Sequence, residues 1–306
     1  MNMKTKVAIV GYGNIGKYAL QALEAAPDME CVGIVRSSAD RCTPEYLAGT
    51  PELSGYKVVT DIAGLGQVDV AILSTPSRSV GENAGKYLLM GISTVDSFDI
   101  HSGIVDLRNS LNPIACKGGA VSIISAGWDP GTDSVIRALV EGMAPSGTTY
   151  TNFGPGRSMG HSVAAASKSG VVKALSMTVP VGKGVHRREV FVELDRGADF
   201  SAVEKAIKED PYFINDETVV KQVPSVDEID THMHGVKLER LGVSGRTEGQ
   251  RMEFNMRINN PALTGQVLVM AARAAMRQTP GCYTMVEVPV IDFLPGNREE
   301  NIKKLV

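Results

Sequence analysis

The sequence has few cysteines, no long apolar run and no leader-like apolar segment near its start. Its four cysteines, Cys31, Cys42, Cys116 and Cys282, are scattered and form no CxxC pair. We therefore expect free thiols in a reducing compartment, each packed as a small hydrophobe. No run reaches the roughly 20 apolar residues that a membrane span needs, and the N-terminus leads directly into an expected strand without a secretory h-region. The sequence predicts a cytoplasmic protein with no membrane partner.

An excess of charge of one sign is also missing. The 31 Lys and Arg residues and the 34 Asp and Glu residues give a net charge of −3, and no basic block stands out. This balance argues against a nucleic-acid partner. The chain has 306 residues, of which 43% are hydrophobic and 21% charged. This composition is typical of a soluble protein, and the length allows two domains with a core that is stable without disulfides or structural metal ions.

Continuous apolar strands alternate with helices over the first half of the chain. The predicted strands are Lys6–Val10, Met29–Val35, Tyr56–Thr60, Val68–Thr75, Ser93–Phe98 and Ala120–Ser125, and the predicted helices are Ile15–Ala26, Val80–Met90, Ile104–Lys117 and Thr132–Met143. This order indicates an α/β fold with a Rossmann-type, doubly wound parallel sheet covered on both faces.

The pattern changes after about residue 145. Apolar residues at every second position predict strands with one solvated face, as in antiparallel sheets. The predicted strands are Thr149–Phe153, Leu175–Val181, Glu189–Leu194 and Arg251–Ile258, and Phe200–Lys208 is a predicted helix. Pro261 opens a further helix, Ala262–Arg277, and the segment Gly281–Val288 and a helix over Arg298–Leu305 follow. We expect an α+β domain with a mainly antiparallel sheet in this region.

A glycine-rich turn, GYGNIG at 11–16, lies between the first strand and the first helix. In a dinucleotide-binding turn, Gly11 allows the tight bend, Gly13 lets the backbone approach a pyrophosphate and Gly16 lets the helix pack on the strand. The helix N-terminus offers amide N–H groups to the phosphates. We expect Gly11, Tyr12, Gly13, Asn14, Ile15 and Gly16 to bind the cofactor; the alternative is a glycine-rich turn of another α/β fold.

Residues at the end of the second strand indicate which nucleotide binds. Arg36, Ser37 and Ser38 stand where an NAD enzyme places an acidic residue for the ribose 2′-hydroxyl, and they favour the 2′-phosphate of NADP. Asp40 leaves NAD as the alternative. Ligands bind at the carboxyl ends of such strands, so the expected cofactor contacts extend to further loops. They are Thr75, Pro76, Ser77, Arg78, Ser97, Phe98, Gly127, Trp128 and Pro130.

Trp128 and Asp129 lie in the turn that follows the strand Ala120–Ser125. An Asp in this position is often a helix cap, and that alternative stays open from the position alone. A Trp exposed at the end of a parallel sheet offers a flat face to a substrate or to a nicotinamide ring.

The chain resembles the meso-diaminopimelate D-dehydrogenase family from about residue 6 to its C-terminus. The matching segments are GYGNIG at 11–16, VDSFDIH at 95–101, SAGWDPG at 125–131, FGPGRSMGHS at 153–162, His186-Arg-Arg188, His234-Gly235 and Asn259-Asn-Pro261. Members of this family are NADP-dependent and typically homodimeric. They convert the D-centre of meso-2,6-diaminopimelate to L-2-amino-6-oxopimelate and ammonia, and the reverse reaction serves lysine and cell-wall precursor synthesis.

The resemblance also implies roles for individual residues. Asp99 and Asp129 would face the reacting D-centre as catalytic and substrate-binding carboxylates. Trp128 and Phe153 would wall the pocket, and Met159 and Gly160 would bind substrate through backbone groups. The distal L-amino-acid end would be held by Thr178, Arg188, His234 and Asn260. From the residues alone, Arg188 is also consistent with a solvated strand charge and His234 with a loop hydrogen-bonder.

The sequence departs from the family at a few positions. Many members carry paired arginines where Arg36, Ser37 and Ser38 stand, and some have Trp at the position of Phe153 and a longer segment near Val181–Val185. A smaller wall and a shorter loop predict activity on other D-amino acids. His232 and His234 form an HxH pair without a third ligand nearby in sequence, so we expect no metal site.

Two other classes of protein are consistent with parts of this sequence. One is a dihydrodipicolinate reductase-like or other NAD(P)-dependent reductase, which shares the two-domain plan. Dihydrodipicolinate reductases usually carry a His-His pair with a nearby Lys, and this sequence lacks that motif. A non-catalytic NADPH sensor would need the glycine loop alone. We expect a dinucleotide-binding domain over residues 1–122, rejoined by 262–306, and a substrate-binding and dimerisation domain over 123–261; the return of the C-terminal segment is implied by the resemblance.

Overall fold

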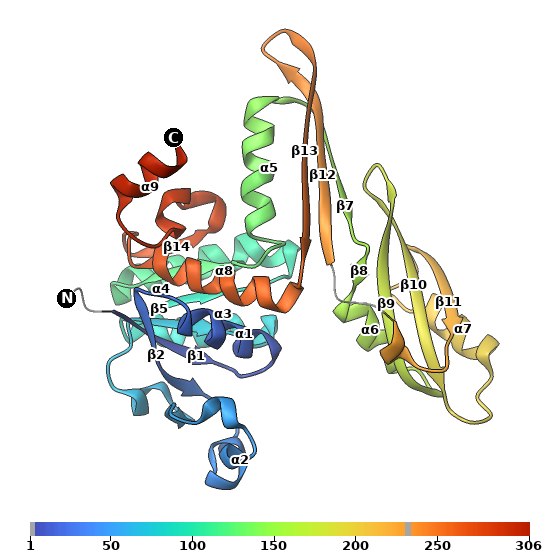
Figure 1. The fold of residues 1–306 in the computed structure, drawn as a ribbon, viewed down its shortest axis with the longest axis horizontal. Coiled ribbons are helices and arrows are strands. Elements are labelled where there is room, and N and C mark those ends of the chain that lie inside the picture. Colours follow the sequence, from blue (N-terminus) through green and yellow to red (C-terminus); the bar gives the residue numbers. More distant parts are fainter. Residues whose placement is uncertain (1–3, 230–233) are drawn as a thin grey trace. The chain divides into compact units, whose positions relative to one another are not determined.

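A seven-stranded parallel sheet forms the centre of one part of the molecule (Figure 1). The structure is a computed structural model that describes residues 4–229 and 234–306. In the order β14-β6-β5-β4-β1-β2-β3, the strands are β14 (Gly281–Thr284), β6 (Val121–Ile124), β5 (Ser93–Asp96), β4 (Val70–Leu73), β1 (Thr5–Val10), β2 (Met29–Val35) and β3 (Val58–Val59). Each neighbouring pair is parallel, which confirms the predicted sheet.

Helices cover both faces of this sheet because its strands are apolar on both sides. In β1, Val7 and Ile9 belong to one core cluster and Ala8 and Val10 to the other, as the two-residue period of a strand requires. The first cluster takes side chains from α1 (Asn14–Glu24) and α8 (Asn260–Ala275), and the second from α3 (Ser77–Leu89) and α4 (Ile104–Gly118). The remaining helices of this part are α2 (Pro44–Ala48) and α9 (Arg298–Leu305).

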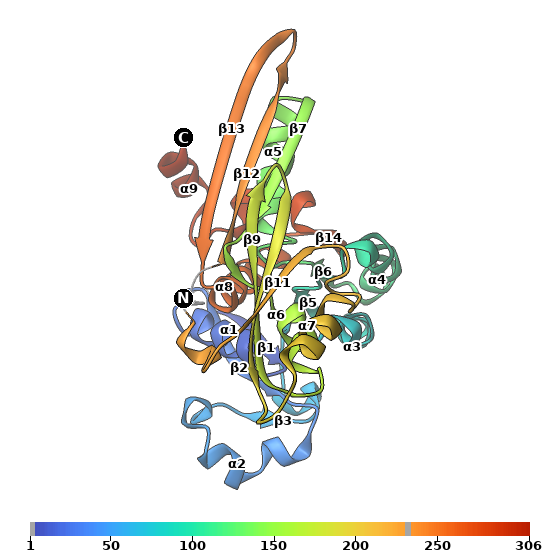
Figure 2. The same cartoon turned by 90° about the vertical axis from the view of Figure 1, so that its right-hand side faces the viewer.

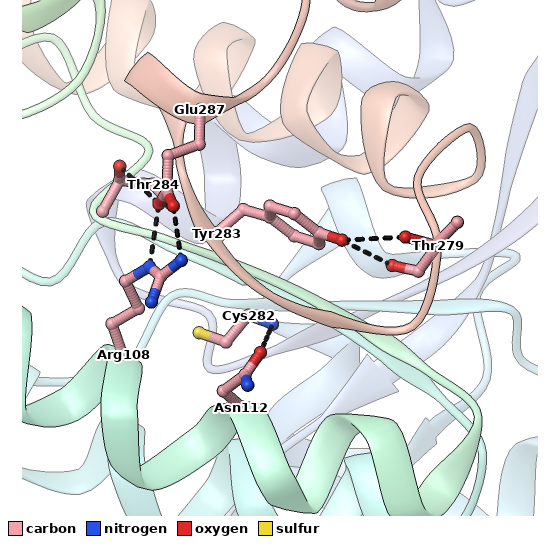
Figure 3. Close-up of polar contacts among 7 residues, drawn as sticks. All are labelled: Arg108, Asn112, Thr279, Cys282, Tyr283, Thr284 and Glu287. Atoms are coloured by element: carbon pink, nitrogen blue, oxygen red, sulfur yellow. Dashed lines mark hydrogen bonds and ion pairs between the residues drawn. The ribbon is translucent and has the colours of Figure 1, made fainter.

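The C-terminal segment returns to the sheet and adds β14 beside β6. Side chains of α4 hold it in place (Figure 3). The Arg108 guanidinium binds the Glu287 carboxylate, with 2.9 Å from Nε to Oε2, and the amide of Cys282 donates to Asn112 Oδ1 at 3.0 Å. The Glu287 carboxylate also accepts a hydrogen bond from the amide of Thr284 at 2.8 Å. The turn after β14 is therefore held both by α4 and by a contact within the turn itself.

Two smaller sheets make up the other part of the molecule (Figure 2). One has the order β11-β10-β9-β8 and the other the order β13-β12-β7. Only the β10–β11 pair among them is parallel; the others are antiparallel. The elements are β7 (Ser146–Phe153), β8 (Gly156–Arg157), α6 (Met159–Ala166), β9 (Val171–Gly182), β10 (Val185–Leu194), α7 (Phe200–Lys208), β11 (Glu217–Gln222), β12 (His234–Ser244) and β13 (Thr247–Ile258).

The two parts are separate units. The first comprises Met1–Ile136 and Pro261–Val306, and the second Arg137–Asn260, so the boundary lies inside α5 (Thr132–Met143). This boundary differs from the predicted one at 122/123. The difference arises because β6 pairs with β5 and β14 and keeps the turn after it with the parallel sheet.

Several predicted elements agree with the structure to the residue: Met29–Val35, Thr132–Met143, Phe200–Lys208 and Arg298–Leu305. Strand β12 was not predicted. Its buried positions include Arg240, which is 4% exposed and donates to the backbone oxygen of Ala144 at 3.0 Å. A charged residue on the buried face breaks the apolar alternation that identifies a strand. The helix α6 and the strands β8 and β11 were also missed, and the strand expected over Tyr56–Thr60 is only Val58–Val59.

The four cysteines are free thiols, as expected. Cys282 is buried, Cys31 and Cys42 are half-buried, and Cys116 is exposed at the end of α4. The prediction that each is a buried hydrophobe is therefore confirmed for Cys282 and wrong for Cys116. Among the residues that the structure describes, no helix combines the length and the apolarity that crossing a bilayer requires.

A nearly buried ion pair joins α8 to the loop before β2. Arg273 is 6% exposed and donates two hydrogen bonds to the Asp28 carboxylate, at 2.6 and 2.8 Å. Removing one partner of a buried pair leaves the other charge uncompensated. We therefore predict that Arg273→Met lowers the free energy of unfolding by about 2–4 kcal/mol, measured by urea denaturation.

The matched control is Lys86→Met. Lys86 pairs with Asp61 at 3.0 Å, but both side chains are more than half exposed, so its loss should change stability by less than about 0.5 kcal/mol. Equal effects of the two substitutions would contradict the structural role assigned to Arg273.

Candidate active site

The glycine turn between β1 and α1 has the geometry of a phosphate cradle. A side chain at Gly11 (φ +90°) would place its Cβ 2.6 Å from the Ser74 backbone oxygen, and one at Gly16 would meet the Gly11 oxygen at 2.5 Å. A Cβ at Gly13 would meet no heavy atom of the described residues within 4 Å. Two glycines therefore let the backbone pack closely, and the third faces open space where a ligand can approach.

The helix α1 begins at Asn14, directly after this space, and no side chain caps its N-terminus. Amide N–H groups at a helix N-terminus carry partial positive charge and bind phosphate oxygens. Gly11, Tyr12, Gly13, Asn14, Ile15 and Gly16 thus form one continuous backbone segment suited to a diphosphate. These residues fit a dinucleotide cofactor.

Arg36 lies beside the same turn. Its guanidinium carbon is 5.8 Å from the ring centroid of Tyr12 and 5.6 Å from that of Tyr46 in α2, and Nη1 donates to the Tyr12 backbone oxygen at 3.3 Å. Arg36 is only 4% exposed. Ser37 is exposed, and Ser38 donates to Asp40 at 3.3 Å. The structure therefore brings the predicted nucleotide-selecting residues next to the glycine turn, and it adds Tyr46.

The loops after β4 and β5 meet through a predicted catalytic residue. Ser77 at the start of α3 donates to Asp99 Oδ1 at 2.6 Å. Asp99 itself is exposed, and so are Pro76 and Arg78. The hydroxyl of Thr75 is buried and has no hydrogen-bond partner among the described residues, which makes it available to a ligand group. The contact between Ser77 and Asp99 joins a predicted cofactor loop to a predicted substrate residue.

A fully buried carboxylate, Asp96, connects the loops after β5 and β6. Its Oδ1 accepts the amide of Phe98 at 2.9 Å and the amide of Ser125 at 3.1 Å. Its Oδ2 has no hydrogen-bond partner within residues 4–229 and 234–306. Burial raises the pKa of Asp96 to about 6, and the two amide N–H donors oppose this rise. Asp96 therefore fixes the position of the segment that leads to Asp99 against the segment that leads to Asp129.

The turn after β6 depends on glycine. Gly131 has φ +142°, and a Cβ there would lie 1.9 Å from the Gly127 backbone oxygen. The Gly127 amide donates to the Pro130 oxygen at 3.1 Å, and the Asp133 amide donates to the Trp128 oxygen at 3.0 Å. This compact turn buries Trp128, which is 7% exposed. The prediction of an exposed Trp is therefore wrong, because the turn folds back on the start of α5.

Residues expected at the distal end of the substrate lie in the second unit, where Thr178 and Arg188 occupy adjacent strands and His234 begins a strand of the other sheet. Thr178 of β9 pairs with Gly156 of β8 on one side and with Arg188 of β10 on the other. A Cβ at Gly154 (φ +93°) would lie 2.2 Å from the Thr178 oxygen, and one at Gly156 would lie 2.6 Å from Cα of His234. The GPG segment thus brings Thr178 and His234 together.

Phe153 lies at the end of β7, next to the same segment. Its amide donates to Nε2 of His186 at 2.8 Å, and the two rings are 5.5 Å apart. Gly160 is exposed near the start of α6, and Met159 contributes the first residue of that helix. Asn260 begins α8, one residue after the end of β13 at Ile258.

Arg188 is not a solvated strand charge. Its side chain is 16% exposed, its Nε donates to Asp216 Oδ2 at 2.6 Å, and its Nη1 donates to the Thr178 hydroxyl. Burial and the Arg188 guanidinium lower the pKa values of His161, His186 and His234. These histidines are therefore neutral at pH 7, and Arg188 is the cation of this cluster.

Sequence reasoning did not identify Tyr46, Asp216 or the role of Asp96. Asp96 lies within the segment VDSFDIH, in which the sequence predicted roles for Ser97, Phe98 and Asp99 only. Tyr46 and Asp216 lie outside the segments that carry the resemblance, so only their contacts reveal them. His232 lies outside the described residues. Over 4–229 and 234–306, no three His, Cys, Asp or Glu side chains are arranged to hold a metal ion.

Comparison with known proteins places the chain in a family. A family profile for the diaminopimelic acid dehydrogenase C-terminal domain matches residues 127–187. The meso-diaminopimelate D-dehydrogenase of Bacteroides fragilis is 62% identical over 303 residues, which cover 99% of both chains. The chain belongs to the meso-diaminopimelate D-dehydrogenase family.

Solved structures of this family have the same fold. The C. glutamicum DAP dehydrogenase in complex with DAP superposes with a TM-score of 0.84 at 30% identity, covering 99% of this chain and 100% of that one. An engineered D-amino acid dehydrogenase bound to NADP+ gives a TM-score of 0.79 at 29% identity over the same shares. A dihydrodipicolinate reductase from Paenisporosarcina sp. TG-14 is 12% identical with a TM-score of 0.51, so that likeness is one of fold alone.

The buried carboxyl of Asp96 predicts a pH-dependent stability. An unfolded Asp releases its proton near pH 4, whereas the folded protein holds it up to about pH 6. Between these values rising pH destabilises the folded state. We predict that Asp96→Asn, which keeps one acceptor oxygen and cannot ionise, gains stability over the parent as pH rises from 4 to 7, by on the order of 2–3 kcal/mol at pH 7.

The measurement is denaturant unfolding of both proteins at several pH values. The control is Asp61→Asn, because Asp61 is exposed and its pKa is lowered by the amide of Ala63 and by Lys86. That variant should follow the parent between pH 5 and 7. A constant difference between Asp96→Asn and the parent over this range would contradict the prediction.

Proposed function

We propose that this protein is an NADP-dependent dehydrogenase of meso-2,6-diaminopimelate. It oxidises the D-amino centre to give L-2-amino-6-oxopimelate and ammonia, and it runs in reverse as a reductive aminase. The observation that carries the proposal is the pair of loops bearing Asp99 and Asp129, which Asp96 ties together through Phe98 and Ser125. A non-catalytic NADPH sensor would have no need of this arrangement.

The cofactor would be held by the glycine turn, the N-terminus of α1 and Arg36. The open space beyond Gly13 and the uncapped helix suit the diphosphate, and Arg36, Ser37 and Ser38 suit the 2′-phosphate of NADP. When bound, NADP accepts a hydride from the D-carbon of the substrate. Thr75, Pro76, Ser77, Arg78, Ser97, Phe98, Gly127, Trp128 and Pro130 are proposed to complete the cofactor contacts.

At the reacting end, Asp99 and Asp129 hold the substrate ammonium group. A carboxylate that first binds this group can then accept its proton, and its negative charge stabilises the iminium that forms as hydride leaves. Water adds to the imine carbon, and collapse of the carbinolamine releases ammonia. The hydrogen bond from Ser77 orients Asp99 for this task, and the Gly131-dependent turn positions Asp129.

At the other end, a distal subsite made of Thr178, Arg188, His234 and Asn260 is proposed to bind the L-amino-acid group. Arg188 is suited to a carboxylate because its planar guanidinium donates parallel hydrogen bonds, and Thr178 already lies against it. Phe153 and Trp128 would wall the pocket, and Met159 and Gly160 would offer backbone groups.

The cellular setting is also a proposal. Lysine and diaminopimelate biosynthesis in the cytoplasm, and a homodimeric state, are typical of the family. The half-exposed apolar face of β13, formed by Met252, Phe254, Met256 and Ile258, supports association through the second unit. Activity on other D-amino acids is proposed from the Phe153 wall.

An isomer-resolved assay tests the activity. NADPH formation with meso-diaminopimelate is expected, and none with the L,L isomer, because only the meso compound presents a D-configured centre to the two aspartates. NADPH absorbance measures both rates. Turnover of the L,L isomer at a comparable rate, or of neither isomer, would refute the proposed function.

Asp129→Asn tests the role of the catalytic carboxylates. Loss of a positioned proton acceptor is expected to reduce kcat at least about 100-fold, while the dissociation constant for NADP changes less than about threefold because Asp129 is proposed to touch substrate. Steady-state kinetics and fluorescence titration give the two quantities. Asp106→Asn, at an exposed acid of α4, should behave as the parent; normal turnover in Asp129→Asn would remove Asp129 from the mechanism.

A further inference from the structure

One acidic residue, Asp216, contacts the distal subsite but has no role in the function proposed above. Asp216 lies immediately before β11, and its Oδ2 accepts a hydrogen bond from Arg188 Nε at 2.6 Å. Its side chain is 28% exposed, so solvent and small molecules reach it. Its Oδ1 accepts no hydrogen bond within residues 4–229 and 234–306.

The charges around Arg188 nearly cancel. Arg188 and Asp216 contribute one positive and one negative charge. His161, whose Nε2 lies 3.9 Å from Asp216 Oδ2, is neutral at pH 7, because burial and Arg188 lower its pKa. His186 and His234 are neutral for the same reasons. The cluster formed by Arg188, Asp216 and these three histidines therefore has a cationic and an anionic end, and its net charge is close to zero.

We propose that Asp216 is a substrate-binding residue that accepts the distal ammonium group while Arg188 binds the distal carboxylate. This assignment rests on the proposed function, since it assumes that the distal end of the substrate reaches Arg188. The pair would recognise a zwitterionic amino-acid head group and discriminate against a molecule that ends in a carboxylate alone.

Electrostatics supports this selectivity. A lone carboxylate brought to Arg188 would also approach Asp216, because the two side chains are in direct contact, and like charges held close together repel. An ammonium group on the adjacent carbon offsets that repulsion and donates to Asp216, as a charge-assisted hydrogen bond. Specificity then comes from an attractive contact to one ligand and a repulsive contact to its competitor.

The test compares two substrates on the same enzyme. Meso-diaminopimelate carries the distal ammonium, and D-2-aminopimelate has the same chain and the same reacting centre but lacks that group. For Asp216→Asn, kcat/KM on meso-diaminopimelate should fall about 10- to 100-fold, the range that a hydrogen bond to a charged group contributes. The loss should appear mainly in KM. On D-2-aminopimelate the same variant should retain or improve kcat/KM.

The ratio of the two kcat/KM values does not depend on the fraction of protein that is folded, because both are measured on one preparation. If Asp216→Asn does not fold, the ratio of the two kcat/KM values is measured on Asp216→Ser instead. The matched control is Glu217→Gln, which removes a charge at the neighbouring exposed position and should leave the ratio unchanged.

Equal losses on both substrates would show that Asp216 only orients Arg188, and they would overturn the proposal. Unchanged kinetics, or a larger loss on D-2-aminopimelate, would overturn it as well. Failure of the parent protein to oxidise meso-diaminopimelate refutes the proposed function and this inference together. A parent that is active, with variants that keep the substrate ratio, refutes the inference alone.

Discussion

In the first unit, the parallel strands end at one edge of the sheet, and the positions of the candidate site residues depend on this arrangement. Loops after β4, β5 and β6 meet there, and short polar contacts fix them: Ser77 against Asp99, and Asp96 against the amides of Phe98 and Ser125. A loop held only by its own backbone would move independently of its neighbours. Because one buried carboxyl spans two strand ends, the acidic side chains beyond it are held by the sheet rather than by the loops.

In the second unit, a charged side chain is likewise fixed by polar contacts from neighbouring segments. Arg188 on β10 contacts the Thr178 hydroxyl of β9 on one side and the Asp216 carboxylate just before β11 on the other. Burial and the guanidinium itself keep the neighbouring histidines neutral. Charge is therefore concentrated on one cation and one anion in a partly desolvated setting, where each contact is stronger than it would be in water. The proposed carboxylates and nucleotide-binding residues thus lie in the first unit, and the proposed distal charged pair lies in the second.

Local patterns in the sequence predicted what depends on local spacing. Apolar runs identified the parallel strands, and the glycine spacing at 11–16 identified the tight turn between β1 and α1. The burial of Trp128 follows from how its turn folds back on the start of α5. The contacts of Tyr46 with Arg36 and the pairing of Asp216 with Arg188 arise between different segments, 10 and 28 residues apart. Strand β12 was missed for the same reason, since Arg240 is satisfied by backbone oxygens about 95 residues away. No periodicity within a segment reveals such partners.

Arg36, which we propose selects the nucleotide, has its guanidinium over the rings of Tyr12 and Tyr46, so the proposed role is coupled to local packing. An exposed arginine can be exchanged in evolution at little structural cost. Replacing a guanidinium that is packed against Tyr12 and Tyr46 would uncover ring faces and remove a donor from the Tyr12 carbonyl oxygen. If Arg36 selects the nucleotide as proposed, a change to another dinucleotide would require repacking around Tyr12 and Tyr46, with compensating substitutions in α2 as well as at the arginine itself.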